Sequence, residues 1–485
     1  MQQPATNVSL RGVTLGRHAF LGRPVLSALL VLGTLSIGAD TASVRPAAHS
    51  FQMPSPTAIT AVTVVDGTSR MDGRPMTVII RDGAFAAVEP AAGLPPPADA
   101  LLVDGRGRYL VPGLWDMHVH LAKSGVDSLA LFVANGVTSV RDMGGDFELV
   151  RGWRADVAAG RLVGPRIRTA GPMLESADRV RRMKARGTVE PVDRFRVPVS
   201  DPGEAARAVE ALAHLGVDFV KVRTVASQET YEAIARAAAG AGLALAGHGD
   251  VAPPDVMLRA GQQSIEHAIH PSLDRLGTAE RARFIARLAS GGVAIVPTMI
   301  NYYEWMLVPP GDARRAVEDA GGRLDPRRRY ISGYLLDDWR EQIDERGGVR
   351  DALLRRVLLP RAYGGVLKDL RDMHRAGVRF LPGTDVAVAL MYPGFSLRDE
   401  LRYFVDDIGM SPMEALASAT MVSAEFSGAA ASLGTIEVGK LADAVLLSAD
   451  PRADIRNLQH IEGVVLGGRW FDRAALDALL QSAVR

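Results

Sequence analysis

The first residues able to support chemistry are two histidines, His118 and His120, with a single residue between them. Residues two apart on a β-strand point to the same face, so both imidazoles could bind one metal ion. Such a pair is a weak signal by itself, because each ring could equally be a hydrogen-bonded core histidine. Its position strengthens the metal hypothesis: it lies at the end of a predicted strand, and catalytic residues of parallel barrels gather at the carboxyl ends of strands.

A lysine in an apolar setting is the second feature. Lys221 lies in the strand-like segment Phe219–Arg223, where an unpaired ammonium group would be costly to bury. One interpretation is a salt bridge, or a side chain that extends to the surface. The other is that CO2 carboxylates the amine, which would turn the cation into an anionic, bidentate ligand able to bridge two metal ions.

Three more polar residues close predicted strands: His248, His267 and Asp385. Asp385 could cap a helix, or its strand-end position could make it a proton carrier. The chain contains no cysteine, which excludes disulfides, thiolate metal sites and cysteine nucleophiles. A metal would therefore sit on His, Asp, Glu or a modified side chain. The sequence has no phosphate-binding loop of the P-loop or Rossmann type.

The elements that must position these residues alternate between strand and helix through residues 114–430, which predicts an α/β fold, a (β/α)8 TIM barrel. A charged insert of about residues 300–378 is too long for a plain loop, so we predict a helical lid or substrate cover. The predicted strands are Leu114–His118, Thr138–Arg141, Ile167–Ala170, Phe219–Arg223, Leu243–Gly247, Ser264–His267, Ala294–Pro297 and Arg379–Gly383.

Short β segments occur at both ends of this barrel region. Residues 58–113 contain strand-like stretches divided by turn residues, and residues 431–485 contain further β segments, followed by a helix. Segments from opposite ends of a chain can pair when the middle folds as a closed unit. We therefore predict a small β-sandwich domain formed by the N- and C-terminal segments.

The N-terminus, residues 1–43, carries basic residues, then the apolar run Val25–Ile37, then small residues. The run is short for a membrane span but typical of a signal peptide, which predicts export to the periplasm or the outside; a membrane anchor is the alternative. A Pro- and Ala-rich linker, residues 44–57, follows. A net charge of +1 gives no reason to expect nucleic acid as a partner. We expect a small-molecule substrate, and a homo-oligomer remains open.

The residues above resemble the amidohydrolase superfamily, whose two-metal members carry HxH on strand one, a carboxylated lysine on strand four, histidines on strands five and six, and an aspartate on strand eight. Two longer segments carry the same resemblance: Val111–His120, and Gly434–Val445, which returns the chain to its first β segments. Val137–Asp142 is similar to the imidazolonepropionase-related branch, which includes metal-dependent dipeptidases and prolidase-like enzymes.

By this resemblance, His118, His120 and Asp385 would bind one divalent ion, and His248 and His267 would bind the second. The carbamate of the strand-four lysine and a hydroxide would bridge the ions, with zinc expected first and manganese or iron as alternatives. The ions would lower the pKa of the shared water, and Asp385 would carry its proton to the leaving amine. The implied reaction is hydrolysis of an amide or peptide-type C–N bond.

Three other functions compete with this one. The same metals could hydrolyse an ester, a lactone or an organophosphate. Deaminases of this superfamily usually lack the strand-four lysine and place a glutamate three residues after the strand-five histidine, where this chain has Val251. A non-catalytic binding protein would typically have lost metal ligands, and none is missing here.

Four further residues are candidate substrate contacts: Arg141, His270, Tyr302 and Tyr303. The arginine could instead pair with the adjacent Asp142, and the tyrosines could pack the insert. The loop after the third predicted strand and Arg398 both differ from the prolidase-like branch. For that reason the resemblance does not transfer a dipeptide or prolyl substrate.

Overall fold

The structure is a computed structural model that describes residues 56–67, 73–267, 273–274, 276–331, 333–346 and 358–484. The predicted export segment, nearly all of the predicted linker and His270 lie outside the described residues. Among the residues described, no helix has the length and apolarity needed to cross a membrane.

Two parallel sheets form the centre of the fold, and every strand pair in them is parallel. One sheet has the order β6-β7-β8 and the other the order β10-β9-β11-β12-β13-β14-β15. The strands are β6 Leu114–Val119, β7 Val137–Asp142, β8 Arg166–Thr169, β9 Met173–Ser176, β10 Arg196–Val199, β11 Phe219–Val222, β12 Ala244–His248, β13 Gln262–Glu266, β14 Ala294–Val296 and β15 Arg379–Phe380. The protein therefore has a mixed α/β fold with parallel sheets.

Backbone hydrogen bonds also connect these sheets beyond their regular ladders. The N–H of Met117 in β6 donates to the carbonyl of Pro382, just after β15, at 2.8 Å, and Asp385 N–H donates to the His118 carbonyl at 2.7 Å. Asp218, which precedes β11, donates from its N–H to the carbonyl of Thr169 in β8 at 2.9 Å. All eight predicted strands overlap observed ones, whereas the pair β9 and β10 was not predicted. Closure into one barrel stays a prediction.

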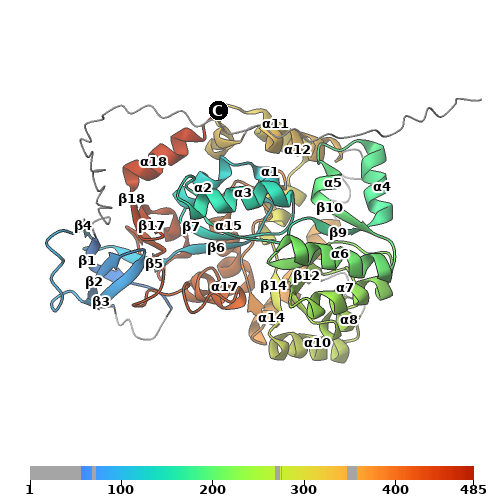
Figure 1. Ribbon diagram of the computed structural model, residues 1–485, viewed down its shortest axis with the longest axis horizontal. Helices are drawn as coiled ribbons and strands as arrows, with labels where there is room; N and C mark the ends of the chain where they lie inside the picture. The colour runs from blue at the N-terminus through green and yellow to red at the C-terminus, as the bar shows by residue number, and fades with distance from the viewer. Residues whose placement is uncertain are drawn as a thin grey trace, which may run out of the picture. The chain divides into compact units, whose positions relative to one another are not determined.

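Helices follow most of the strands, and their ends show why the chain forms them. The α6 helix begins with Pro202, which suits a first helical turn, and the Asp201 side chain accepts a hydrogen bond from Glu204 N–H. It ends at Gly216, whose left-handed conformation (φ +80°) closes the helix. In Figure 1, α6 and α7 pack on each other. The helices outside the insert are α1 Leu121–Ser124, α2 Ser128–Ala134, α3 Phe147–Ala158, α4 Ala177–Arg186, α5 Val192–Phe195, α6 Pro202–Leu215, α7 Gln228–Gly240, α8 Pro254–Arg259, α10 Thr278–Gly291, α15 Ser396–Tyr403, η4 Phe404–Ile408, α16 Pro412–Ser418, α17 Met421–Phe426, η5 Ile455–Gln459 and α18 Arg473–Ser482.

The two faces of β11 lie in different surroundings. Val220 and Val222 belong to the large apolar cluster that the sheets share with the helices. Phe219 belongs instead to a small cluster with Ala246 of β12 and two other residues. Because successive strand residues alternate between faces, Lys221 points to the same side as Phe219, away from the helices.

A third sheet joins the two ends of the described chain, with the order β18-β17-β16-β5-β1-β2-β3 and β4 paired to β1. Its strands are β1 Thr57–Val64, β2 Pro75–Arg81, β3 Ala84–Pro90, β4 Leu101–Asp104, β5 Tyr109–Pro112, β16 Ala444–Leu447, β17 Ile461–Leu466 and β18 Arg469–Asp472. Antiparallel pairing of Val111 in β5 with Val445 in β16 joins the N-terminal strands to the C-terminal ones. In Figure 1 the blue strands β1, β2 and β3 lie on the same side of the molecule as the red β17 and β18. The β-sandwich itself stays a prediction.

The described part of the insert between β14 and β15 is mostly helical. It consists of η1 Asn301–Met306, α11 Pro310–Glu318, η2 Pro326–Tyr330, α12 Gly333–Asp344 and α14 Leu359–Arg375. In α12, Gln342 donates to the Ala387 carbonyl and accepts from Ala389 N–H, at 2.8 and 3.0 Å. The insert thus contacts the loop that follows Asp385.

Candidate active site

Three of the sequence-predicted ligands meet at the carboxyl end of β6. The Nε2 atoms of His118 and His120 lie 3.4 and 3.3 Å from Oδ1 of Asp385. One ligand atom from each of the three residues falls within 4.8 Å of the others. Two ligands bound at about 2.1 Å to one tetrahedral ion lie about 3.4 Å apart, so this geometry fits a shared metal ion.

The other two histidines lie beside this group. His248 ends β12 and His267 follows β13, and their ring centroids are 4.6 Å apart. The His267 ring is also 4.7 Å from the ring of His118. The structure therefore brings all four predicted histidine ligands and Asp385 into one cluster.

Lys221 completes the predicted set. Its side chain is fully buried, and Nζ has no hydrogen-bond partner among the described residues. Burial lowers the pKa of the Lys221 amine to about 8; nearby Glu266 acts against this shift, and nearby Arg141 adds to it. An unpaired buried amine is costly, and it is the atom that a carbamate would convert into an anionic metal ligand. The donor set of histidines, carboxylate and modified lysine thus fits a pair of divalent ions.

These residues line a cavity of about 280 Å³. Its wall contains five of the six predicted metal ligands, His118 being the exception, together with side chains from the insert and neighbouring loops. The lining residues are His120, Lys123, Met173, Arg196, Lys221, Arg223, His248, His267, Gln342, Asp385, Ala387 and Val388.

The far nitrogen of three histidines is held by another group of the chain. Nδ1 of His118 lies 2.8 Å from Oε2 of Glu266, and Nδ1 of His120 lies 2.8 Å from the Gly144 carbonyl. Nδ1 of His267 lies 2.8 Å from the Thr298 hydroxyl. Such contacts fix the ring orientation and leave Nε2 directed at a ligand, as in many metal sites.

The electrostatic surroundings favour the neutral form of His118, His248 and His267. Burial lowers the pKa of His118 to about 4 and that of His267 to about 3, although Asp385 acts against both shifts. Burial and the nearby Lys221 lower the pKa of His248. Burial alone would raise the pKa of Asp385, but the adjacent histidines hold it well below the ordinary value. Neutral imidazoles and an ionised carboxylate are the forms that bind metal ions.

The backbone is strained where the site residues leave their strands. Asp385, His267 and Thr298 have φ angles of +55°, +64° and +45°. Residues other than glycine seldom adopt this left-handed region, which costs on the order of 1–3 kcal/mol each. Such strain persists where surrounding structure fixes it, and it concentrates at functional sites.

The comparison with known families decides the identity of this fold. The model of the Amidohydrolase family matches residues 109–471. The chain belongs to the amidohydrolase family. It is a hydrolase that acts on carbon–nitrogen bonds.

Individual relatives of this amidohydrolase are distant. The imidazolonepropionase of Pseudomonas aeruginosa strain LESB58 is 26% identical over 417 residues, covering 80% of this chain and 94% of the relative. The crystal structure of a putative prolidase from Bifidobacterium longum is 26% identical with a TM-score of 0.66, covering 89% of this chain and 99% of that chain. The structure of a bottromycin amidohydrolase is 23% identical, and the match covers 89% of this chain and 91% of that chain. Its TM-score of 0.66 shows that the two proteins share a fold.

Three of the four candidate substrate residues, Arg141, Tyr302 and Tyr303, are not among the residues that line the cavity. Arg141 is buried and donates to the Met117 carbonyl, to Ser264 Oγ and to Glu266 Oε1, so its ion-pair partner is Glu266, not Asp142. The Tyr302 and Tyr303 hydroxyls donate to the Leu359 carbonyl at 2.9 Å and to Asp407 at 2.8 Å, contacts that pack the insert. His270 lies outside the described residues.

Several residues of this site were missed in the sequence. Asn301 donates from Nδ2 to Oδ2 of Asp385 at 2.9 Å, and Glu266 orients His118. Arg223 and Gln342 line the cavity. A usable signal existed for Glu266, a charged residue directly before His267 in a predicted strand, and for Arg223, two residues after Lys221 on the same strand face.

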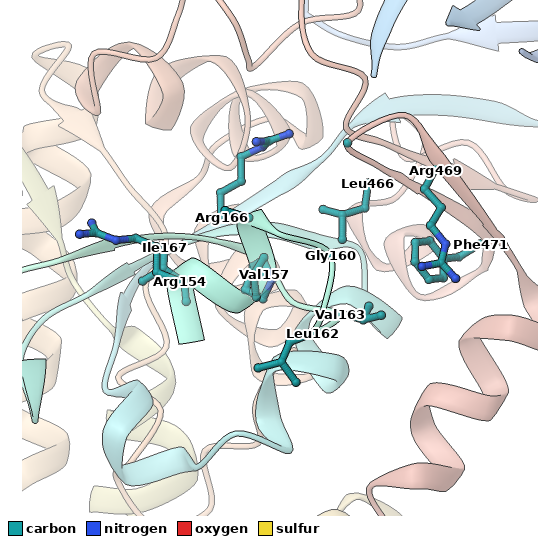
Figure 2. Close-up of a pocket in the computed structure, with 13 residues that line it drawn as sticks. Arg154, Val157, Gly160, Leu162, Val163, Arg166, Ile167, Leu466, Arg469 and Phe471 are labelled. Atoms are coloured by element: carbon teal, nitrogen blue, oxygen red, sulfur yellow. The ribbon is translucent and has the colours of Figure 1, made fainter. Parts of the chain in front are cut away.

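A larger cavity, of about 490 Å³, lies elsewhere on the amidohydrolase (Figure 2). It is formed by α3, β8 and the β17–β18 hairpin, and it contains none of the predicted metal ligands. Two of its arginines are already paired, Arg154 with Asp218 and Arg166 with Asp443. The smaller cavity at the strand ends is therefore the better candidate for chemistry.

Proposed function

We propose that this amidohydrolase is a metal-dependent enzyme that cleaves an amide or peptide-type C–N bond in the cavity above β6, β11 and β12. The observation that carries the proposal is the buried Nζ of Lys221, which has no hydrogen-bond partner in the described part of the chain. It lines a cavity together with Asp385 and three of the four clustered histidines. A cation would be disfavoured at this position, whereas a carbamate bound to metal ions would be stable there.

The proposal includes the architecture that positions these ligands. The strands β6, β7, β8, β11, β12, β13, β14 and β15 would close one TIM barrel, with β9 and β10 as an added pair beside β11. In support, backbone hydrogen bonds connect β6 to the segment after β15, and β8 to the start of β11. The sheet of residues 58–113 and 431–485 would form the β-sandwich domain.

One ion would be held by His118, His120 and Asp385, and a second by His248 and His267, with a Lys221 carbamate between them. Two divalent cations, zinc foremost, would supply acidity to a shared water and polarise the scissile carbonyl. Asp385 would accept the proton of that water and deliver it to the leaving nitrogen, which would otherwise depart as a strong base. Its hydrogen bond from Asn301 would keep the carboxylate oriented through this transfer.

The names of the relatives point to the same bond type. The Pseudomonas aeruginosa relative is an imidazolonepropionase, and one solved structure is a Xaa-Pro dipeptidase with bound methionine. These names do not say whether the cleaved bond lies in a ring, so the proposal covers cyclic and acyclic amides. Ester, lactone and organophosphate hydrolysis by the same residues is an outcome that the screen below would detect.

Metal analysis tests the site. Purified protein loaded with zinc, manganese or cobalt in the presence of bicarbonate should hold close to two ions per chain. The Lys221→Ala variant should lose both activity and metal, whereas Lys184→Ala, an exposed lysine on α4, should keep them. A value near zero ions in the wild-type protein, or full metal content in Lys221→Ala, would reject the proposed centre.

A hydrolysis screen tests the reaction. The panel consists of N-acyl amino acids, dipeptides, lactones and aryl phosphotriesters, assayed with the metal-loaded protein. Turnover of the first two classes, abolished by a chelator, supports the proposal. Turnover of lactones or phosphotriesters alone would assign the alternative function to the same site.

Residues 1–43 lead us to propose that the chain is exported, with a membrane anchor as the alternative. Fractionation of cells expressing the full chain is the test. Recovery in the periplasm or medium, with an N-terminus near residue 43, supports export. Recovery of the intact chain in the cytoplasm contradicts it.

A further inference from the structure

The proposed reaction leaves one side chain of the cavity without a role. Arg223 directly follows β11, two residues after Lys221, and both residues line the cavity. Two residues of extended strand span about 6.6 Å. A substrate bound at the proposed reaction centre beside Lys221 could therefore extend to the Arg223 guanidinium group. The Arg223 side chain is 29% exposed, unlike the fully buried Lys221.

The contacts of Arg223 leave its donors largely free. In the part of the chain that the structure describes, its one ion pair is from Nη1 to Oε2 of Glu175, at the long distance of 3.5 Å. The same carboxylate oxygen accepts from Arg196 Nη1 at 2.6 Å, and the other oxygen accepts from the Thr224 hydroxyl. Glu175 is thus engaged by other donors, and Arg223 retains nitrogen atoms that have no hydrogen-bond partner among the described residues.

Arg223 also belongs to a network of ion pairs with an excess of one positive charge. Four cations and three carboxylates are linked by successive contacts of 4 Å or less, so one cation has no anion of its own. The members of this network are Lys123, Arg179, Arg196, Arg223, Glu175, Glu190 and Asp338. Arg196 and Lys123 each contact two of the carboxylates, whereas Arg179 and Arg223 each contact Glu175 alone. Of these last two, Arg223 is the one that lines the cavity.

The charges around Arg223 indicate the same missing partner. Arg179 and Arg196 both contact Glu175, the carboxylate that Arg223 also contacts. A guanidinium group in such surroundings gains from an added anion, and its planar fork of donors matches one carboxylate in a bidentate pair. A single excess charge suits a monoanion better than a phosphate dianion.

We infer that Arg223 binds a free carboxylate of the substrate, close to the scissile C–N bond, and that the substrates are carboxylated amides such as N-acyl amino acids and small dipeptides. The inference rests on the proposed function. The cavity of about 280 Å³ fits molecules of this size. Arg223 is then a specificity residue that selects the acid over its neutral analogue.

Binding of uncleavable analogues tests the inference without turnover. The probes are levulinate and 3-benzoylpropionate, in which CH2 replaces the nitrogen of an N-acylglycine, and their primary amides. Calorimetric titration of the metal-loaded protein should show each acid binding at least about tenfold more tightly than its amide, as expected for a charge-assisted pair. In Arg223→Gln this ratio should fall to near one, and Arg223→Lys should give an intermediate ratio.

A matched variant controls for loss of charge alone. Arg469→Gln removes an exposed arginine from the larger cavity of Figure 2 and should keep the wild-type ratio. Circular dichroism checks that the Arg223 variants fold, and the wild-type ratio stands as a test if they do not. Equal binding of acid and amide by the wild type, or a preference that persists in Arg223→Gln, overturns the inference.

The outcomes separate this inference from the proposed function. Preferential binding of the acids without hydrolysis of any amide would reject the proposed reaction and keep the role of Arg223. Metal-dependent amide hydrolysis with no preference for a carboxylate would keep the reaction and reject the role of Arg223.

Discussion

Nδ1 of His118 lies 2.8 Å from Oε2 of Glu266, in the fully buried interior of the sheets. The other oxygen of Glu266 accepts from Arg141 at 2.8 Å and from Ser264 at 2.5 Å. Arg141 and Lys221 hold the pKa of the Glu266 carboxyl far below its ordinary value, although burial opposes this shift. An ionised carboxylate thus accepts from Nδ1–H of His118 and leaves Nε2 as the free lone pair that faces Asp385.

This relationship predicts that Glu266→Gln weakens metal binding without removing a ligand. The amide has no charge to stabilise the Nδ1–H tautomer, and it leaves Arg141 without its anion. We expect metal affinity and kcat to fall by about 10- to 100-fold. Titration with zinc and steady-state kinetics measure both, with Glu148→Gln on exposed α3 as control. Wild-type affinity in Glu266→Gln would show that the contact does not orient the histidine.

The positions of the proposed ligands could be predicted because each depends on local sequence. His118, Lys221, His248 and His267 each lie at or near the end of a short strand-like segment, and such segments form parallel strands whose ends meet. The structure describes them at the ends of β6, β11, β12 and β13. Strand periodicity is readable in a single chain, so the cluster followed from the order of the segments.

The contacts that support the ligands could not be predicted, because they join distant parts of the chain. Glu266 and His118 are 148 residues apart, and Asn301 and Asp385 are 84 apart. From the sequence, Arg141 was either a substrate contact or a partner of its neighbour Asp142, whereas in the structure it forms an ion pair with Glu266. Local patterns reveal which residues follow a strand, but only the fold reveals which side chains then meet.

The strands β9 and β10 were missed for a different physical reason. Each has only four residues, and β10 contains Pro198, which discourages a strand assignment. The two strands pair in parallel, and an ion pair at 2.6 Å also joins Glu175 of β9 to Arg196 of β10. This pair holds Arg196 at the cavity, next to Arg223.

A second prediction concerns the effect of the unmodified Lys221 amine on the free energy of unfolding. Its folded pKa of about 8 lies below the ordinary 10.5 because of burial, so the charged amine destabilises the metal-free fold. By linkage, the cost is fully present below pH 8 and disappears as pH rises to about 10.5. Lys221→Met should therefore raise the free energy of unfolding by on the order of 3 kcal/mol below pH 8, although it abolishes activity.

Urea denaturation in EDTA and bicarbonate-free buffer measures this difference across pH. Lys184→Met, an exposed lysine on α4, should change stability by less than about 0.5 kcal/mol. If Lys221→Met is less stable than wild type at pH 7, burial of the charged Lys221 amine does not destabilise the fold, and this prediction is wrong.

A third prediction separates the two roles of Asp385. Asp385→Asn keeps an oxygen for the Asn301 hydrogen bond but loses the negative charge and the proton acceptor. We expect kcat to fall by about 10²–10⁴, the usual contribution of a positioned acid–base group, with at least one metal ion per chain retained. Asp250→Asn, an exposed carboxylate beyond β12, is the control. Activity within tenfold of wild type would exclude Asp385 as the proton carrier.

The last prediction tests how closely the backbone packs around His118. A Cβ added at Gly383 would lie 2.6 Å from His118 Cβ and 2.7 Å from Val296 Cγ1, both on short, stiff side-chain stems. Gly383→Ala should therefore displace His118, lower stability by about 1–3 kcal/mol and weaken metal binding. Gly364→Ala is the control, because a Cβ there meets nothing within 4 Å and helix α14 favours alanine. Thermal unfolding and metal titration measure both effects; a Gly383→Ala protein with unchanged metal affinity would show that the site tolerates movement of β6 against the segment after β15.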